Sequence, residues 1–121
     1  ALPIFEGWGA VVNEGMNSGC IEIACEEMGA VPYLIKDNEN GLTYPTESYP
    51  AMEQVVLRVF NNWRGYTHLG SNGYATIRDE WNAEVAANRL LGLIDALLGN
   101  GDFELPESGP LSPAPIIHAN Y

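Results

Sequence analysis

A glycine-rich turn that leads directly into an amphipathic helix constrains this chain more than any other stretch. The turn reads Gly7-Trp8-Gly9, and from Ala10 and Val11 onward apolar side chains recur at helical spacing. Glycine lets a backbone come close to a ligand, and the free N–H groups of a first helical turn, at the positive end of the helix dipole, favour a phosphate. The pattern therefore predicts a loop followed by a helix that receives an anion.

Two carboxylates flank this turn. Glu6 comes just before it, and Glu14 lies one to two turns inside the predicted helix. One ligand could then touch a carboxylate, the backbone amides and a second carboxylate in succession. We expect that ligand to be long and polar, with negative charge in its middle.

The stretch resembles the Glu-x7-Glu motif of retaining glycosyltransferases of the GT-B fold, in particular the large group 1 (GT4-like) family. Further elements of that family recur here in the same order over roughly residues 1–98. They are Ser18-Gly19 before a predicted strand, Met28-Gly29-Ala30-Val31-Pro32 after it, and Asn38-Glu39-Asn40-Gly41-Leu42 further on. The resemblance implies a site for a nucleotide-diphosphate sugar and an acceptor that is a sugar or a lipid-linked molecule.

The same resemblance implies a role for each residue of the motif. Glu6 would be the catalytic carboxylate that contacts donor-sugar hydroxyls near the reacting carbon. The amides of the turn and of the first helical residues would meet sugar and phosphate oxygens; these residues are Gly7, Trp8, Gly9, Ala10 and Val11. Glu14 would accept hydrogen bonds from the ribose hydroxyls. Neither a metal nor a cofactor is implied, because helix N-terminal amides and basic side chains serve the diphosphate in this family.

The expected fold class is α/β, as the C-terminal part of a Rossmann-like GT-B domain with about two parallel strands and several helices. Residues 20–25 and 42–44 are the strand candidates, and residues 28–35 predict a loop with a short helical turn. The family has proline and an apolar residue where Ile21 and Glu22 stand. Glu22 must therefore find a partner, reach solvent or destabilise the strand.

The second half of the chain predicts helices. Ser48 is the expected N-cap of the first and Gly65 its stop, a weaker helical pattern follows, and Asn82 caps the last helix, which ends at Gly99. Their apolar stripes are interpreted as core: Met52, Val55, Val56, Val59, Phe60 and Trp63; Tyr66, Leu69, Gly70, Gly73, Tyr74, Ile77 and Trp81; Ala86, Leu90, Leu93, Ile94 and Leu97. We divide the chain into a domain of residues 1–98 and a Pro/Ser/Gly-rich tail of residues 99–121, a linker or a surface strap.

Composition limits the partners. A net charge of −11, with only five Lys and Arg, argues against nucleic acid and against an anionic membrane surface. No apolar run approaches the ~18 residues of a membrane span, so we predict no direct membrane insertion and a soluble, cytoplasmic protein, with a full-length enzyme peripheral at the membrane as an option. Cys20 and Cys25, five apart on one strand, would point to opposite faces and stay reduced.

Three functional hypotheses remain open. The family places several strand–helix units and an acceptor domain before this motif, so the first is the donor-binding part of a glycosyltransferase, a fragment inactive alone. The second is a non-catalytic interaction or scaffold module whose sheet edge pairs with another chain, in line with the acidic charge and Glu22; as a fragment, too, the chain is expected to self-associate through the exposed sheet edge that the missing strands would cover. The third is half of a nucleotide-sugar epimerase or a phosphorylase, which share the architecture. The donor sugar, its base and the acceptor are left undetermined.

Overall fold

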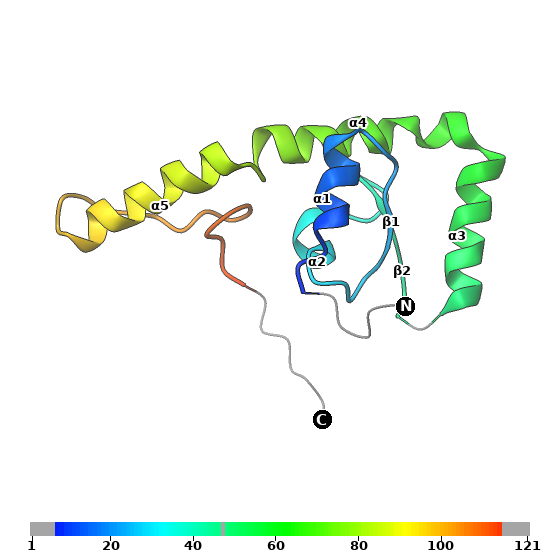
Figure 1. Cartoon of the computed structure of the whole chain (residues 1–121), viewed down its shortest axis with the longest axis horizontal. Coiled ribbons are helices and arrows are strands. Elements are labelled where there is room, and N and C mark those ends of the chain that lie inside the picture. The colour runs from blue at the N-terminus through cyan, green and yellow to red at the C-terminus, as the bar shows by residue number, and fades with distance from the viewer. Residues whose placement is uncertain (1–6, 47, 115–121) are drawn as a thin grey trace, which may run out of the picture. The chain divides into compact units, whose positions relative to one another are not determined.

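The computed structural model describes residues 7–46 and 48–114, and the chain is mixed α/β with about half of its residues in helices (Figure 1). Two short strands, β1 (Ile23–Cys25) and β2 (Leu42–Tyr44), pair in parallel, with Ile23 opposite Leu42 and Cys25 opposite Tyr44. The helices are α1 (Ala10–Asn17), α2 (Val31–Leu34), α3 (Tyr49–Asn61), α4 (Trp63–Asp79) and α5 (Ala83–Leu97). This confirms the α/β class, the strand at residues 42–44 and the helical turn within residues 28–35.

The chain forms two compact units, residues 1–79 and residues 80–121. The first unit holds α1 to α4 and both strands, and α4 packs against both α1 and α3 (Figure 1). Its core is contributed by every element; the most deeply buried side chains are Val12, Met16, Val31, Leu34, Leu42 and Leu69. Leu42 and Leu69, with Val59 of α3, form one cluster that joins the sheet to the two long helices.

The first strand is shorter than the predicted residues 20–25, because the end of α1 uses the backbone of Cys20. Gly19 adopts a left-handed conformation with φ of 72°, and the amide of Cys20 donates to the carbonyl of Gly15 while that of Gly19 donates to Met16. This is a Schellman ending. Cys20 is therefore exposed outside the strand, so the opposite-faces argument is wrong, although both thiols are free.

The caps of two long helices are confirmed. The Oγ of Ser48 accepts from the amide of Ala51 at the start of α3, and the Oδ1 of Asn82 accepts from the amide of Val85 at the start of α5. The predicted stop at Gly65 is wrong, because the break falls at Asn62 (φ −137°, ψ 47°) and α4 resumes at Trp63. Gly65 therefore lies inside α4.

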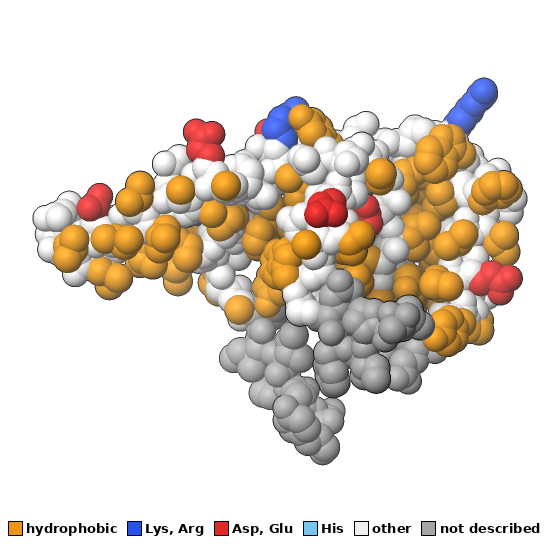
Figure 2. All heavy atoms as spheres, viewed as in Figure 1, with side chains coloured by type: hydrophobic (Ala, Val, Ile, Leu, Met, Phe, Trp, Pro, Cys, Tyr) orange, Lys and Arg blue, Asp and Glu red, His pale blue; other side chains and the backbone are white. Residues whose placement is uncertain are grey.

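The interpretation of all three stripes as core is only partly right. In α4 the stripe is buried at Leu69, Gly70, Gly73 and Ile77, but in α3 only Val59 is buried, and α5 has no buried residue. Phe60 is 79% exposed and Leu97 is 77% exposed. Figure 2 shows the resulting apolar side chains on α3 and, separately, along α5. Helical spacing places side chains on one face, but burial needs an element that covers that face.

In the second unit, the tail folds back on α5, with contacts that reach Pro110. The Nη1 of Arg89 donates to the carbonyls of Ser108 at 2.7 Å and Pro110 at 2.8 Å, and the hydroxyl of Ser108 bonds to Glu80. The ring of Phe103 lies over Gly92. The boundary that we place after residue 98 stays a prediction.

Candidate functional site

The turn before α1 leads into the helix through a left-handed glycine, and the approach of a ligand to it stays a prediction. Gly9 is the N-cap residue of α1, is buried, and has φ of 78° and ψ of 60°, a left-handed conformation that favours glycine. Its carbonyl accepts from the amide of Val12 at 3.0 Å. No side chain caps α1 and its first turn carries no acid, so among the described residues the amides of Ala10 and Val11 have no acceptor.

Gly29 holds this turn in place. A Cβ atom on Gly29 would overlap the carbonyl oxygen of Gly7 and press on Trp8, so the backbone of residues 7 and 8 lies directly against it. Gly29 follows the carboxyl end of β1, at Cys25. The turn is thus attached to the carboxyl edge of a parallel sheet, where open α/β sheets bind ligands. The immediate neighbour of Gly29 is thus the backbone of the chain itself.

Trp8 anchors the turn. Its indole N–H donates to Oδ1 of Asn13 at 2.6 Å, and its ring stacks on Tyr33 of α2 with centroids 5.7 Å apart and planes 29° apart. A tryptophan between two glycines can either anchor a turn by packing or stack on a ligand ring. These contacts support the anchor, since they join the turn to both α1 and α2.

The exposed face of α1 carries the other predicted site residues. Val12 and Met16 are buried, whereas Ala10, Val11 and Glu14 are exposed, on neighbouring rows of the helix. A ligand at the free amides of the first turn could therefore continue along the helix to the Glu14 carboxylate. Glu6 lies outside the described residues. Within the ranges described, no group of three or more His, Cys, Asp and Glu side chains could hold a metal ion.

Glu22, just before β1, is half-buried beneath α1. Its Oε1 fills the place where a Cβ on Gly15 would stand, which explains a glycine in the middle of that helix. Burial raises the pKa of the Glu22 carboxyl above its ordinary value of 4.5. The charged form is therefore less favourable in the folded chain than in the unfolded one.

We expect the cost of burying the charged Glu22 carboxylate to make the stability of the chain depend on pH. The pKa of Glu22 is higher in the folded chain than in the unfolded chain. The contribution of Glu22 to the free energy of unfolding is therefore fully present below the unfolded-state pKa and is lost as pH rises through the folded-state pKa. Glu22→Gln should therefore raise the melting temperature at pH 7 relative to wild type, and the difference should vanish near pH 4. Thermal denaturation at a series of pH values measures this. Glu26→Gln, an exposed neighbour, controls for the loss of one negative charge. Equal gains in both variants would contradict the burial argument.

Two arrangements were missed from the sequence. Asn40 is buried, and its side-chain amide donates hydrogen bonds to the carbonyl of Leu34 and to the hydroxyl of Thr76 in α4. Arg58 lines a pocket at the end of β2. Two features of the sequence could have indicated Arg58. It is one of only five Lys and Arg residues, and it follows Val55 by three positions and Gln54 by four, which places all three on one side of a helix.

No family model, no curated protein and no solved structure matches this chain. Among the described residues, no helix combines the length and the apolar character required to cross a membrane.

Proposed function

We propose that this chain supplies the donor-binding part of a retaining glycosyltransferase, with a nucleotide-diphosphate sugar as its ligand. The observation that carries the proposal is the open start of α1, where Gly9 is left-handed, the amides of Ala10 and Val11 are free of partners among the described residues, and no acid stands in the first turn. Attachment of the turn to Gly29, at the carboxyl edge of the sheet, supports the same ligand position.

The chemistry of glycosyl transfer fits this arrangement. The bond from the sugar to the diphosphate breaks with negative charge on the leaving group, so fixed N–H donors aimed at phosphate oxygens stabilise the transition state more than the ground state. Glu14, exposed on the same helix, would accept hydrogen bonds from the ribose hydroxyls. Glu6 would serve the donor sugar, as the resemblance to the family implies.

Binding at α1 tests the proposal directly. We expect UDP-, GDP- or ADP-linked glucose or mannose, titrated into the 15N-labelled chain, to shift the amide resonances of Gly9, Ala10 and Val11 in a saturable manner. Glu14→Ala removes a charge-assisted hydrogen bond of about 1.5–3 kcal/mol, so the dissociation constant should rise roughly tenfold to a hundredfold. Glu53→Ala, an exposed glutamate of α3, should leave it unchanged.

Two results would count against this function. If none of these nucleotide sugars shifts the α1 amides, the donor-binding proposal fails. If Glu53→Ala weakens binding as much as Glu14→Ala, the ligand does not contact Glu14.

A non-catalytic interaction module is the second candidate, and the exposed apolar side chains favour it. Phe60 and Trp63 in the first unit are 79% and 58% exposed, and Leu97 in the second is 77% exposed. Large exposed apolar side chains in contiguous patches are typical of surfaces that meet other proteins. Self-association in sedimentation velocity, together with no nucleotide-sugar binding, would favour this module over the donor site.

A further inference from the structure

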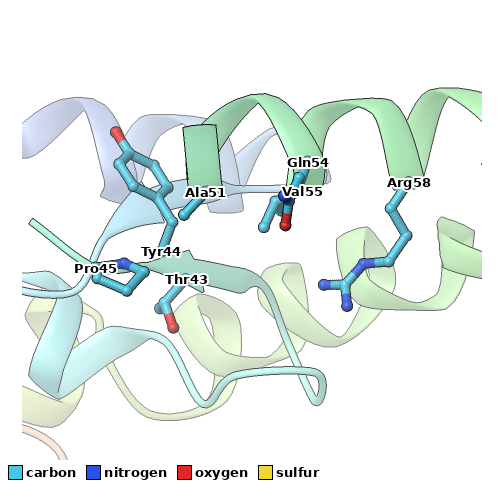
Figure 3. A pocket seen from close by; sticks show the side chains of 7 residues that line it. All are labelled: Thr43, Tyr44, Pro45, Ala51, Gln54, Val55 and Arg58. Carbon is cyan, nitrogen blue, oxygen red and sulfur yellow. The ribbon is translucent and has the colours of Figure 1, made fainter. Parts of the chain in front are cut away.

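A hollow lies between β2 and α3, and none of its lining residues belongs to the start of α1. It has a volume of about 210 Å³ and opens to solvent. Its apolar surface comes from Pro45, Ala51 and Val55, and its polar groups come from Thr43, Gln54 and Arg58. Figure 3 shows Gln54, Val55 and Arg58 along α3, facing the segment of β2 that carries Thr43. A cation therefore stands at the margin of an apolar recess.

Arg58 is held in a way that leaves its donors available. Its guanidinium carbon lies 5.8 Å from the ring centroid of Tyr66 in α4, so the aromatic ring covers the cation from one side. The N–H groups of a guanidinium lie in its plane and form a fork that matches carboxylate or phosphate oxygens. Stacking and anion binding are therefore compatible, and the stacking limits the side chain's freedom before a ligand arrives.

Arg58, like Lys36 and Arg64, has no acidic partner among the described residues, and of these three it is the one that borders this recess. The sequence has 16 Asp and Glu, yet within the described ranges none of them forms an ion pair with Arg58. By contrast, Arg78 pairs with Asp79 at 2.6 Å, and Arg89 donates to two carbonyls of the tail. A guanidinium beside a recess, with no carboxylate of its own among the described residues, is suited to an anion from outside.

We propose that this pocket binds a small ligand that carries a carboxylate or phosphate group on an apolar or aromatic body. Arg58 binds the anionic oxygens, and Pro45 and Val55 contact the body of the ligand. The volume is below the roughly 300–1,000 Å³ of typical pockets for drug-sized ligands, so a single ring fits better than a whole nucleotide sugar. The pocket shares no residue with the start of α1, and the inference does not depend on the proposed function.

The net charge of −11 limits the affinity without excluding the ligand. At physiological salt, charges more than about 8 Å away are largely screened, so the local guanidinium decides the binding energy while the overall charge slows encounter. For a small anion bound by one solvent-exposed guanidinium, we expect a dissociation constant on the order of 1 mM. The measurement must therefore reach millimolar concentrations.

The test is an NMR titration of the full 15N-labelled chain with four probes. Phenyl phosphate and benzoate should shift the amides of Thr43, Tyr44 and Val55 with saturation. Phenol and inorganic phosphate, which each lack one half of the recognised chemistry, should require at least tenfold higher concentrations. Equal binding of phenol and phenyl phosphate would overturn the anion site, and shifts confined to other segments would overturn the location. A response to only one of phenyl phosphate and benzoate identifies which anion the pocket takes.

Matched arginine variants complete the test. Arg58→Gln should weaken phenyl phosphate at least tenfold, whereas Arg64→Gln, an exposed cation in the first turns of α4, should change the affinity less than twofold. Arg58→Lys keeps the charge but loses the planar fork, so it should retain part of the affinity. Equal losses in the Arg58→Gln and Arg64→Gln variants would indicate general attraction to positive charge and overturn the proposal. If Arg58→Gln does not fold, the affinities of Arg58→Lys and of the wild-type chain for the four probes decide whether the guanidinium binds the anion.

Discussion

Gly70→Ala is expected to lower the free energy of unfolding of the first unit by about 3 kcal/mol, a large effect for a single substitution. A Cβ at Gly70 would overlap the carbonyl oxygen of Gly19. That carbonyl cannot move easily, because Gly19 is held left-handed by the Schellman ending of α1. Urea denaturation followed by circular dichroism measures the loss, which should lower the melting temperature by roughly 10 °C for a chain of this size.

A matched control lies in the same helix. Gly65 also stands inside α4, but there the nearest atoms to a Cβ would be those of the Asn62 side chain, which is exposed and can rotate. Gly65→Ala should therefore stabilise the chain by about 0.5–1 kcal/mol through the better helix propensity of alanine. Similar losses in both variants would mean that the close approach of α4 to the end of α1 does not limit stability.

Asn40→Ala is expected to have the second largest effect, about 3 kcal/mol or more. The Oδ1 of Asn40 accepts from the amide of Lys36 at 2.7 Å, and its Nδ2 donates to the carbonyl of Leu34 and the hydroxyl of Thr76, each at 2.9 Å. Asn40 is only 5% exposed, so its removal leaves these partners without a bond in a poorly hydrated place. Chemical denaturation gives the free energy of unfolding.

Asn72→Ala separates burial from hydrogen bonding as such. Asn72 also joins the turn to α4, since its Nδ2 donates to the carbonyl of Glu39 at 2.7 Å, but its side chain is exposed. Water can replace that bond, so we expect a loss below about 1 kcal/mol. If the two asparagine variants lose equal stability, the buried network around Asn40 is not what joins the turn to α4.

The elements predicted correctly from the sequence are those with local signals. Ser48 and Asn82 cap α3 and α5 through bonds to amides three residues ahead, and such bonds follow from the residues themselves. The strand at residues 42–44 was bounded by a turn and by Pro45 in the same way. The exposed stripes of α3 and α5 were misjudged because spacing defines a face and carries no information about what covers it.

In the candidate site, too, some local features could be predicted from the sequence and the long-range contacts could not. The loop followed by a helix was predicted from Gly7-Trp8-Gly9 and the apolar spacing after it, whereas the left-handed Gly9 and the uncapped start of α1 were not. The contact of Gly29 with Gly7 joins residues 22 positions apart, and the bond from Asn40 to Thr76 joins residues 36 positions apart. Neither contact could be read from one sequence, because both depend on how α1, α2 and α4 pack.

The close packing of α1 on α4 also bears on the order in which the chain can fold. Residues 10–17 are synthesised before their partner, α4, which spans residues 63–79 and therefore leaves the ribosome later. An eight-residue helix is unstable alone in water, so α1 and the glycine turn must wait, largely unstructured, until α4 arrives. The glycine turn and α1 would then be completed only after the pairing of β1 with β2, which joins segments closer in sequence.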